Sequence, residues 1–153
     1  AAPFGLLLRG EGGGSRPAYF DVESWRVIAE SAGSASRGEA LAEATVKITA
    51  GGRRLAVIGE GNGPVNALDH ALRQAIEQVY PDVARFHLID FRVRILDQGH
   101  GTDAVTRVLI ETSDGKDSWV TVGVGANMIE ASWEALVDAV VYGLRLHQVT
   151  PLR

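Results

Sequence analysis

Three glycines precede a proline and a helix-like pattern in the stretch 59–72. The glycines are Gly59, Gly61 and Gly63, and Pro64 suits the first position of a helix because its missing N–H would have no partner there. Glycines let backbone N–H groups come close to a ligand, and a helix N-terminus favours an anion. The stretch therefore predicts a site for a small anionic group, such as an amino-acid carboxylate.

The spacing of these glycines also occurs in dinucleotide-binding loops. That motif needs a parallel βαβ unit and an acidic residue about 20 positions later. Here the preceding strands are expected to pair as hairpins, and Gly123 and Gly125 repeat the pattern. We interpret the glycines as a shared structural turn, and we favour an anionic group over a nucleotide.

Other reactive residue types lack the spacing that chemistry requires. The four histidines do not form a metal-binding pattern, and the acidic stretch 114–117 sits where a hairpin must turn, not in a calcium loop. The sequence has no cysteine, no serine in a nucleophile elbow and no carboxylate pair that stands out. We expect no catalytic residue, no metal site and no cofactor in this chain.

Composition places the chain among ordinary globular proteins. It has 153 residues, 46% of them hydrophobic and 22% charged, with a net charge of −4. Basic residues are scattered, so no nucleic-acid partner is expected. The apolar run 4–8 is too short for a membrane span and lacks the features of a signal peptide. We expect no membrane association and a cytoplasmic location.

Apolar periodicity and turn residues predict six strands and two helices. Strands are expected at 19–30, 42–50, 54–60, 87–97, 104–113 and 118–124, and helices at 65–79 and 128–146. Turns are expected at Gly51 with Gly52 and at Asp114 with Gly115, and Asn127 is the expected N-cap of the second helix.

Two strands carry finer signals. The first changes the phase of its alternation near Ser24, which indicates a bulge or a strong twist. The strand at 87–97 is expected to place one apolar set on a single face, namely Ile89, Phe91, Val93 and Ile95.

The second half of the chain repeats the first after a shift of 64 residues. The shift aligns seven identical pairs: Gly51/Gly115, Gly59/Gly123, Gly61/Gly125, Ala67/Ala131, Ala71/Ala135, Leu72/Leu136 and Ala75/Ala139. We predict an α+β fold of two βββα units related by a pseudo-twofold repeat, each an antiparallel three-stranded sheet with one helix.

The expected boundaries follow from this repeat. We expect the tail of a linker or subdomain at 1–16, a single domain at 17–147 and a C-terminal tail at 148–153. The domain divides into units at 17–81 and 82–147. The glycine-rich segment 10–15 is expected to be a flexible linker, so the chain is expected to be a fragment.

Five motifs in order strongly resemble one family. They are GNGPVNA at 61–67, LIDFRVRILD at 88–97, GTDA at 101–104, SWVTVGV at 118–124 and NMIEASW at 127–133. The chain from about residue 19 to residue 146 resembles the C-terminal allosteric (regulatory dimerisation) domain of 2-isopropylmalate and citramalate synthases. The last two motifs favour the citramalate synthase branch, and the run 4–8 looks like the end of the linker subdomain in those enzymes.

The resemblance implies that the domain at 17–147 is a non-catalytic regulatory domain. Such a domain forms a homodimer, binds an end-product amino acid and inhibits a separate N-terminal (β/α)₈ catalytic barrel, whose metal and substrate sites are missing from this chain. Isoleucine is the effector implied by the citramalate synthase branch. Two alternatives stay open: leucine sensing, as in a 2-isopropylmalate synthase, and a purely structural dimerisation module without an effector.

The resemblance also implies an effector pocket at the dimer interface. The implied lining residues are Gly61, Asn62, Gly63, Val65, Leu88, Phe91, Ile95, Thr102, Ala104 and Thr106. The helix end would take the carboxylate, groups near Thr102 the ammonium, and the apolar residues a branched side chain. Isopropylmalate synthases tend to carry a tyrosine and a small residue where this chain has Phe91 and Ile95, which leaves the choice between isoleucine and leucine open.

Overall fold

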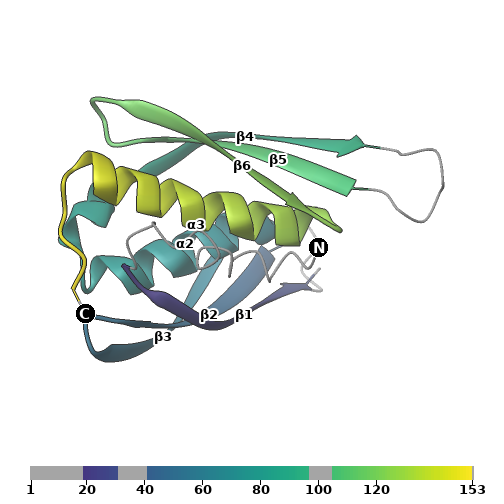
Figure 1. Cartoon of the computed structure of the whole chain (residues 1–153). Coiled ribbons are helices and arrows are strands. Elements are labelled where there is room, and N and C mark those ends of the chain that lie inside the picture. Colours follow the sequence, from purple (N-terminus) through teal and green to yellow (C-terminus); the bar gives the residue numbers. More distant parts are fainter. Residues whose placement is uncertain (1–18, 31–40, 97–104, 153) are drawn as a thin grey trace. The chain divides into compact units, whose positions relative to one another are not determined.

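The computed structural model of the chain describes residues 19–30, 41–96 and 105–152. By its internal contacts the described chain divides into a first unit, residues 19–84 with 149–152, and a second unit, residues 85–148. Each unit contains three antiparallel strands followed by a helix (Figure 1). The predicted α+β class with two βββα units is confirmed.

The first unit is built on a sheet with the strand order β1-β2-β3. Its elements are β1 (Asp21–Glu30), β2 (Leu41–Ala50), β3 (Arg53–Asn62), the helix α2 (Pro64–Glu77) and the short 3-10 helix η2 (Pro81–Arg85). Gly51 and Gly52 form the predicted turn with φ angles of 57° and 76°. A register shift between Val22 and Ser24 confirms the predicted bulge.

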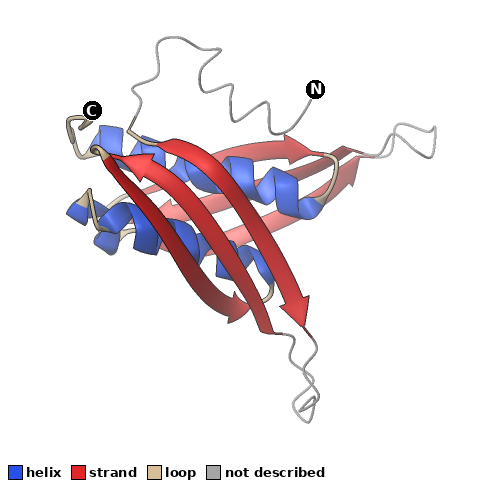
Figure 2. Cartoon of the chain, turned by 90° about the horizontal axis from the view of Figure 1, so that it is seen from below, coloured by secondary structure: helices blue, strands red, loops and turns tan. Residues whose placement is uncertain are grey.

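The second unit repeats this arrangement in the order β4-β5-β6. Its elements are β4 (His87–Leu96), β5 (Val105–Ser113), β6 (Ser118–Gly125) and the helix α3 (Met128–Leu146). Figure 2 shows the strands of each sheet lying side by side and twisted, as expected for antiparallel strands. Asn127 caps α3, because its side chain accepts a hydrogen bond from the Glu130 N–H at 3.0 Å.

One sequence prediction about β4 is wrong. The pairing with β5 shifts between Leu88 and Asp90, so Ile89 is an extra residue that interrupts the alternation. Residues directly opposite each other share a face of the sheet, and Leu88 lies opposite buried Thr112. Leu88, not Ile89, therefore shares the face of Phe91.

The helices lie unusually close to the third strand of each sheet. A Cβ atom added to Gly59 would lie 2.5 Å from the Ala71 N atom, and one added to Gly123 would lie 1.9 Å from the Ala131 O atom. Only glycine fits at these positions. The residues that are identical between the two halves thus include those at which strand and helix backbones meet.

Each sheet buries the face that carries its own helix. On the middle strands the buried residues alternate along the chain, as in Val46 and Ile48 of β2 and Val108 and Ile110 of β5. Trp119 Nε1 on β6 also donates to the Ala139 carbonyl of α3 at 3.0 Å. No helix in the described ranges is long and apolar enough to cross a membrane.

Residues 149–152 belong to the first unit. The Tyr80 hydroxyl donates to the Tyr19 carbonyl at 2.8 Å and accepts from the Leu152 N–H at 2.9 Å. The Tyr19 hydroxyl donates to the Val149 carbonyl at 2.7 Å, and the two tyrosine rings meet edge to face. These bonds attach the end of the described chain to the start of β1.

Candidate functional site

The junction between β3 and α2 holds the first group of predicted site residues. Strand β3 ends at Asn62, and α2 begins at Pro64. Gly63 lies between them with φ 98° and ψ 162°, a conformation that essentially only glycine adopts. Asn66 Nδ2 donates back to the Asn62 carbonyl at 3.1 Å, which ties the helix start to the strand end.

The N-terminus of α2 has no side-chain cap. The first helical bond runs from the Ala67 N–H to the Gly63 carbonyl at 3.2 Å. Pro64 has no N–H, so the N–H groups of Val65 and Asn66 are those without an acceptor inside the helix. The other helix is different, because Asn127 caps α3 with its side chain. Of the two α-helices in the described ranges, α2 therefore has the N-terminus better suited to an external anion.

The glycines of this junction have different roles. A Cβ atom on Gly61 would lie 2.8 Å from both the Ala67 N atom and the Asn66 Cβ atom, so Gly61 permits close packing of strand and helix. A Cβ atom on Gly63 would meet nothing within 4 Å, and its positive φ is what demands glycine. Gly63 is thus the residue that keeps the space before the helix open.

The second group of predicted site residues lies on one face of the sheet β4-β5-β6. Phe91 lies opposite buried Ile110, and Ile95 lies opposite buried Thr106. With Leu88, these residues share the face on which α3 packs. The helix packs on β6 and β5, while Phe91 and Ile95 are 38% and 68% exposed. Strand β4 therefore presents an accessible apolar surface on this side.

The structure thus gathers the site residues into two groups within separate units. Gly61, Asn62, Gly63 and Val65 form the group at the start of α2, and the β4 residues with Thr106 form the other. Thr102 and Ala104 lie outside the described residues. Among residues 19–30, 41–96 and 105–152, no cluster of three histidine or acidic residues could hold a metal ion.

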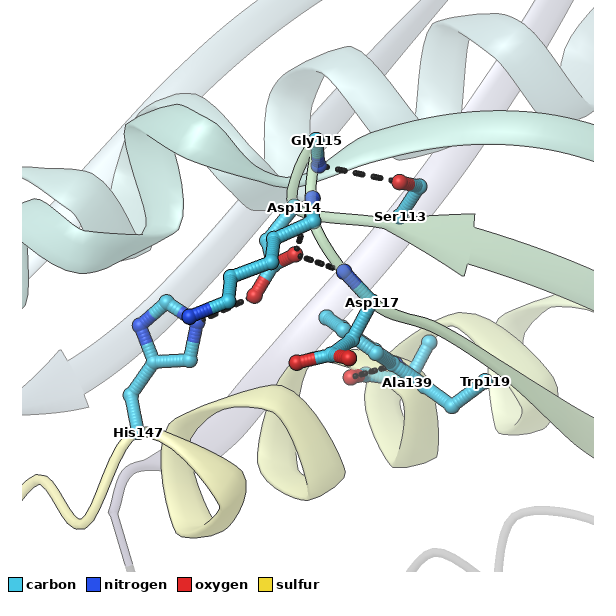
Figure 3. Close-up of polar contacts among 8 residues, drawn as sticks. Ser113, Asp114, Gly115, Asp117, Trp119, Ala139 and His147 are labelled. Carbon is cyan, nitrogen blue, oxygen red and sulfur yellow. Dashed lines mark hydrogen bonds and ion pairs between the residues drawn. The ribbon is translucent and has the colours of Figure 1, made fainter.

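A polar cluster closes the predicted turn between β5 and β6, and its contact with His147 was not predicted from the sequence. Asp114 Oδ1 accepts hydrogen bonds from the Lys116 and Asp117 N–H groups, and Asp114 Oδ2 lies 2.6 Å from His147 Nε2 (Figure 3). Hydrogen bonds from the Asp117 N–H, His147 and the Lys116 N–H hold the pKa of the Asp114 carboxyl well below its usual range. The cluster joins the turn to the end of α3 and confirms that this acidic stretch is a hairpin turn.

The strand pairing also excludes a dinucleotide fold at the glycine-rich junction. Strand β3 pairs antiparallel with β2, and the described strands of this sheet are all antiparallel. A dinucleotide loop needs a parallel βαβ unit. The interpretation of Gly59 and Gly61 as a turn is wrong, because both lie within β3, where they allow the strand to pack against α2. Their role is structural, and Gly63 is the glycine that lies between strand and helix.

The chain matches one protein family over most of its length. The family described as the LeuA allosteric (dimerisation) domain matches residues 2–144. The chain belongs to this family. The resemblance inferred from the five motifs is thereby confirmed, and the paired βββα units described above are its architecture in this member.

Full-length relatives carry the same domain as a part of a longer chain. An (R)-citramalate synthase from Streptomyces coelicolor is 53% identical over 150 residues, which is 98% of this chain and 28% of the relative. One from Synechocystis is 48% identical over 148 residues, 95% of this chain and 26% of the relative. A 2-isopropylmalate synthase from Erwinia tasmaniensis is 28% identical over 133 residues, 87% of this chain and 23% of the relative. The chain therefore spans about a quarter of the length of these relatives.

Proposed function

We propose that this chain is the allosteric regulatory domain of an (R)-citramalate synthase and that it binds isoleucine at an interface between two copies. The observation that carries the proposal is the identity of 53% and 48% to two citramalate synthases over nearly the whole chain, against 28% to a 2-isopropylmalate synthase. The partners are then a second copy and an N-terminal catalytic barrel in the full-length protein.

The two groups of site residues supply complementary parts of amino-acid recognition. The Val65 and Asn66 N–H groups at the start of α2 suit the carboxylate of the effector. The face of β4 with Leu88, Phe91 and Ile95 suits a branched apolar side chain. At an interface between two copies, both groups can contribute to one effector without either unit containing the whole pocket.

Regulation then follows from differential affinity. An effector that binds one arrangement of the paired domains more tightly than another shifts the population of that arrangement. A coupling of about 1 to 3 kcal/mol, typical of allosteric proteins, would shift the equilibrium between the two arrangements by about 5- to 150-fold.

Calorimetric titration of the purified chain with isoleucine, leucine and valine tests the proposal. We expect isoleucine to bind most tightly and to raise the melting temperature, with D-isoleucine as a control for stereospecific recognition. Tighter binding of leucine would favour the leucine-sensing alternative. An absence of heat and of thermal stabilisation with all three amino acids would contradict effector binding and leave the structural dimerisation module.

A further inference from the structure

The outward face of the sheet β4-β5-β6 carries a regular arrangement of nine side chains. On β5 the buried residues Val108 and Ile110 face α3, so Leu109 between them faces outward. Across the strands, the first row holds Asp90, Glu111 and Val120, the middle row Arg92, Leu109 and Val122, and the last row Arg94, Arg107 and Val124. We call these nine residues the outer grid.

The apolar part of the outer grid is accessible. Val120, Val122 and Val124 on β6 are 55%, 45% and 41% exposed, and Leu109 lies half-buried beside them. An edge strand with an apolar outward face is a surface that proteins usually cover, because it favours association with another chain.

The first unit provides an internal comparison. After the shift of 64 residues, Leu109 corresponds to Thr45, and Val120, Val122 and Val124 correspond to Ala56, Ile58 and Glu60, with Ile58 58% exposed. The two units differ at Leu109 and Val124, whose counterparts in the first unit are polar. Both units have the same fold, so folding alone does not require apolar residues at these two positions.

The charges of the outer grid are arranged in like pairs. Asp90 lies directly opposite Glu111 at one end, and Arg94 lies directly opposite Arg107 at the other. Like charges that face each other across strands destabilise a sheet. The ion pair recorded on the grid joins Arg92 to Asp90 at 3.3 Å, and the Arg94 and Arg107 row has no acidic residue in it. The arginine end of the grid therefore has no opposite charge in its own row, whereas Asp90 at the other end already pairs with Arg92.

We propose that the outer grid binds the outer grid of a second copy about a twofold axis that crosses the strands at the middle row. This rotation reverses the strand direction and places each strand opposite the same strand of the second copy. Glu111 then faces Arg107 of the second copy, and Asp90 faces its Arg94. The valines of β6 meet those of the second copy, and Leu109 meets its own counterpart. Arg92 also meets its own counterpart, so four contacts between opposite charges stand against one between like charges. Two sheets packed in this way would be nearly aligned, as in β-sandwiches.

This contact is separate from the proposed effector surface. Leu88, Phe91 and Ile95 lie on the opposite face of the same sheet, the face that carries α3. The contact between outer grids therefore requires no effector, and it adds an interface to the one named in the proposed function.

Charge reversal tests the pairing directly. Because the contact is twofold, an Arg107→Glu substitution turns two attractive contacts into two repulsive ones. We expect the dissociation constant of the assembly to rise at least about 10-fold. The double variant Arg107→Glu with Glu111→Arg exchanges the charges and restores the complementarity, so it should assemble like the original chain. Sedimentation velocity over a dilution series measures the assembly, and circular dichroism checks that each variant is folded.

Equivalent positions in the two units supply a matched control. Val122→Lys places a charge in the middle row and should weaken the assembly, whereas Ile58→Lys at the corresponding, 58% exposed position of β3 should not. Equal effects of the two substitutions would contradict the assignment of the face. So would a wild-type chain that stays monomeric, an Arg107→Glu variant that assembles normally, or a charge exchange that fails to restore assembly.

Isoleucine titration of the Arg107→Glu variant separates this inference from the proposed function. Retained isoleucine binding together with weakened assembly supports both. If assembly weakens in the variant but the wild-type chain does not respond to isoleucine, the outer-grid contact is supported and only the proposed effector binding is contradicted.

Discussion

The side chains of His147 and Asp114 meet at 2.6 Å, between Nε2 and Oδ2, although 33 residues separate them in the chain. His147 directly follows α3, and Asp114 lies in the turn between β5 and β6. The Phe86 ring lies edge to face against the imidazole at 5.3 Å. The pair therefore connects the helix end to the sheet of the second unit through a contact that is largely shielded from water.

Loss of the Asp114 charge should destabilise the chain in a pH-dependent way. Asp114→Asn keeps Oδ1 for the two N–H groups of the turn but removes the carboxylate from His147. Because folding lowers the pKa of Asp114, its contribution to stability is full above the unfolded value of about 3.9 and is lost as the pH falls through the folded value. Urea unfolding should show wild type more stable than the variant at pH 7, with a difference that shrinks below about pH 4.

Asp117→Asn is the matched control for this prediction. It removes the same charge from the same turn and leaves both bonds to Asp114 Oδ1 in place. A pH-independent difference for Asp114→Asn, or an equal effect of the two substitutions, would argue against the His147 contact as the cause.

Tyr80→Phe should destabilise the first unit. The substitution leaves the Leu152 N–H and the Tyr19 carbonyl without the hydroxyl that now bonds both. We expect a loss of about 1 to 3 kcal/mol in the free energy of unfolding, measured by urea titration. Tyr142→Phe, on an exposed face of α3, is the control and should change stability by less than about 0.5 kcal/mol.

Gly123→Ala should be severely destabilising. Its Cβ atom would lie 1.9 Å from the Ala131 O atom, so β6 and α3 would have to move apart. We expect a loss of about 3 kcal/mol or more, or a failure to fold. A methyl group added at Gly52 would lie in open space, so Gly52→Ala costs only the backbone strain of a φ of 76°, about 1 to 2 kcal/mol of stability. Thermal unfolding of the two variants side by side would show whether space or φ is decisive, and similar melting temperatures would contradict the close-contact explanation.

Gly63→Val should abolish effector binding and leave the assembly of the chain intact. A side chain at φ 98° and ψ 162° strains the backbone directly before α2, and it occupies the open space next to the Val65 and Asn66 N–H groups. Isoleucine titration by calorimetry measures the loss. Gly52→Val carries similar backbone strain at the hairpin turn and should still bind isoleucine. A Gly63→Val variant that dissociates would show instead that the junction holds the assembly together.

Local signals explain why most of the fold could be predicted from the sequence. The glycine pair at 51–52 and the Asp114 turn set the two hairpins, and the Asn127 cap sets the start of α3 at the observed residue. The extra residue Ile89 was missed because it continues the apolar alternation of Phe91 and Val93, so the sequence shows no change of phase there, unlike the one near Ser24 that indicated the bulge of β1. The bond between His147 and Asp114 depends likewise on tertiary structure.

Only part of the candidate site could be predicted from the sequence. The chemistry of the 61–65 junction follows from glycine and proline, while the lining residues on β4 came from the family resemblance. The structure places Leu88, Phe91, Ile95 and Thr106 on one face, and effector binding there stays a prediction. The outer grid was missed because like charges become neighbours only once the register of β4 against β5 is known. The alternating valines of β6 were its visible signal.

The close contacts of Gly59 with Ala71 and of Gly123 with Ala131 have a consequence for how the chain can diversify. Where two backbones touch directly, the spacing of strand and helix does not depend on the size of any intervening side chain. Outward residues can then be exchanged while the architecture is preserved. The chain is in this sense a duplicated platform, in which both copies keep a common shape and each is free to specialise in its own surface chemistry.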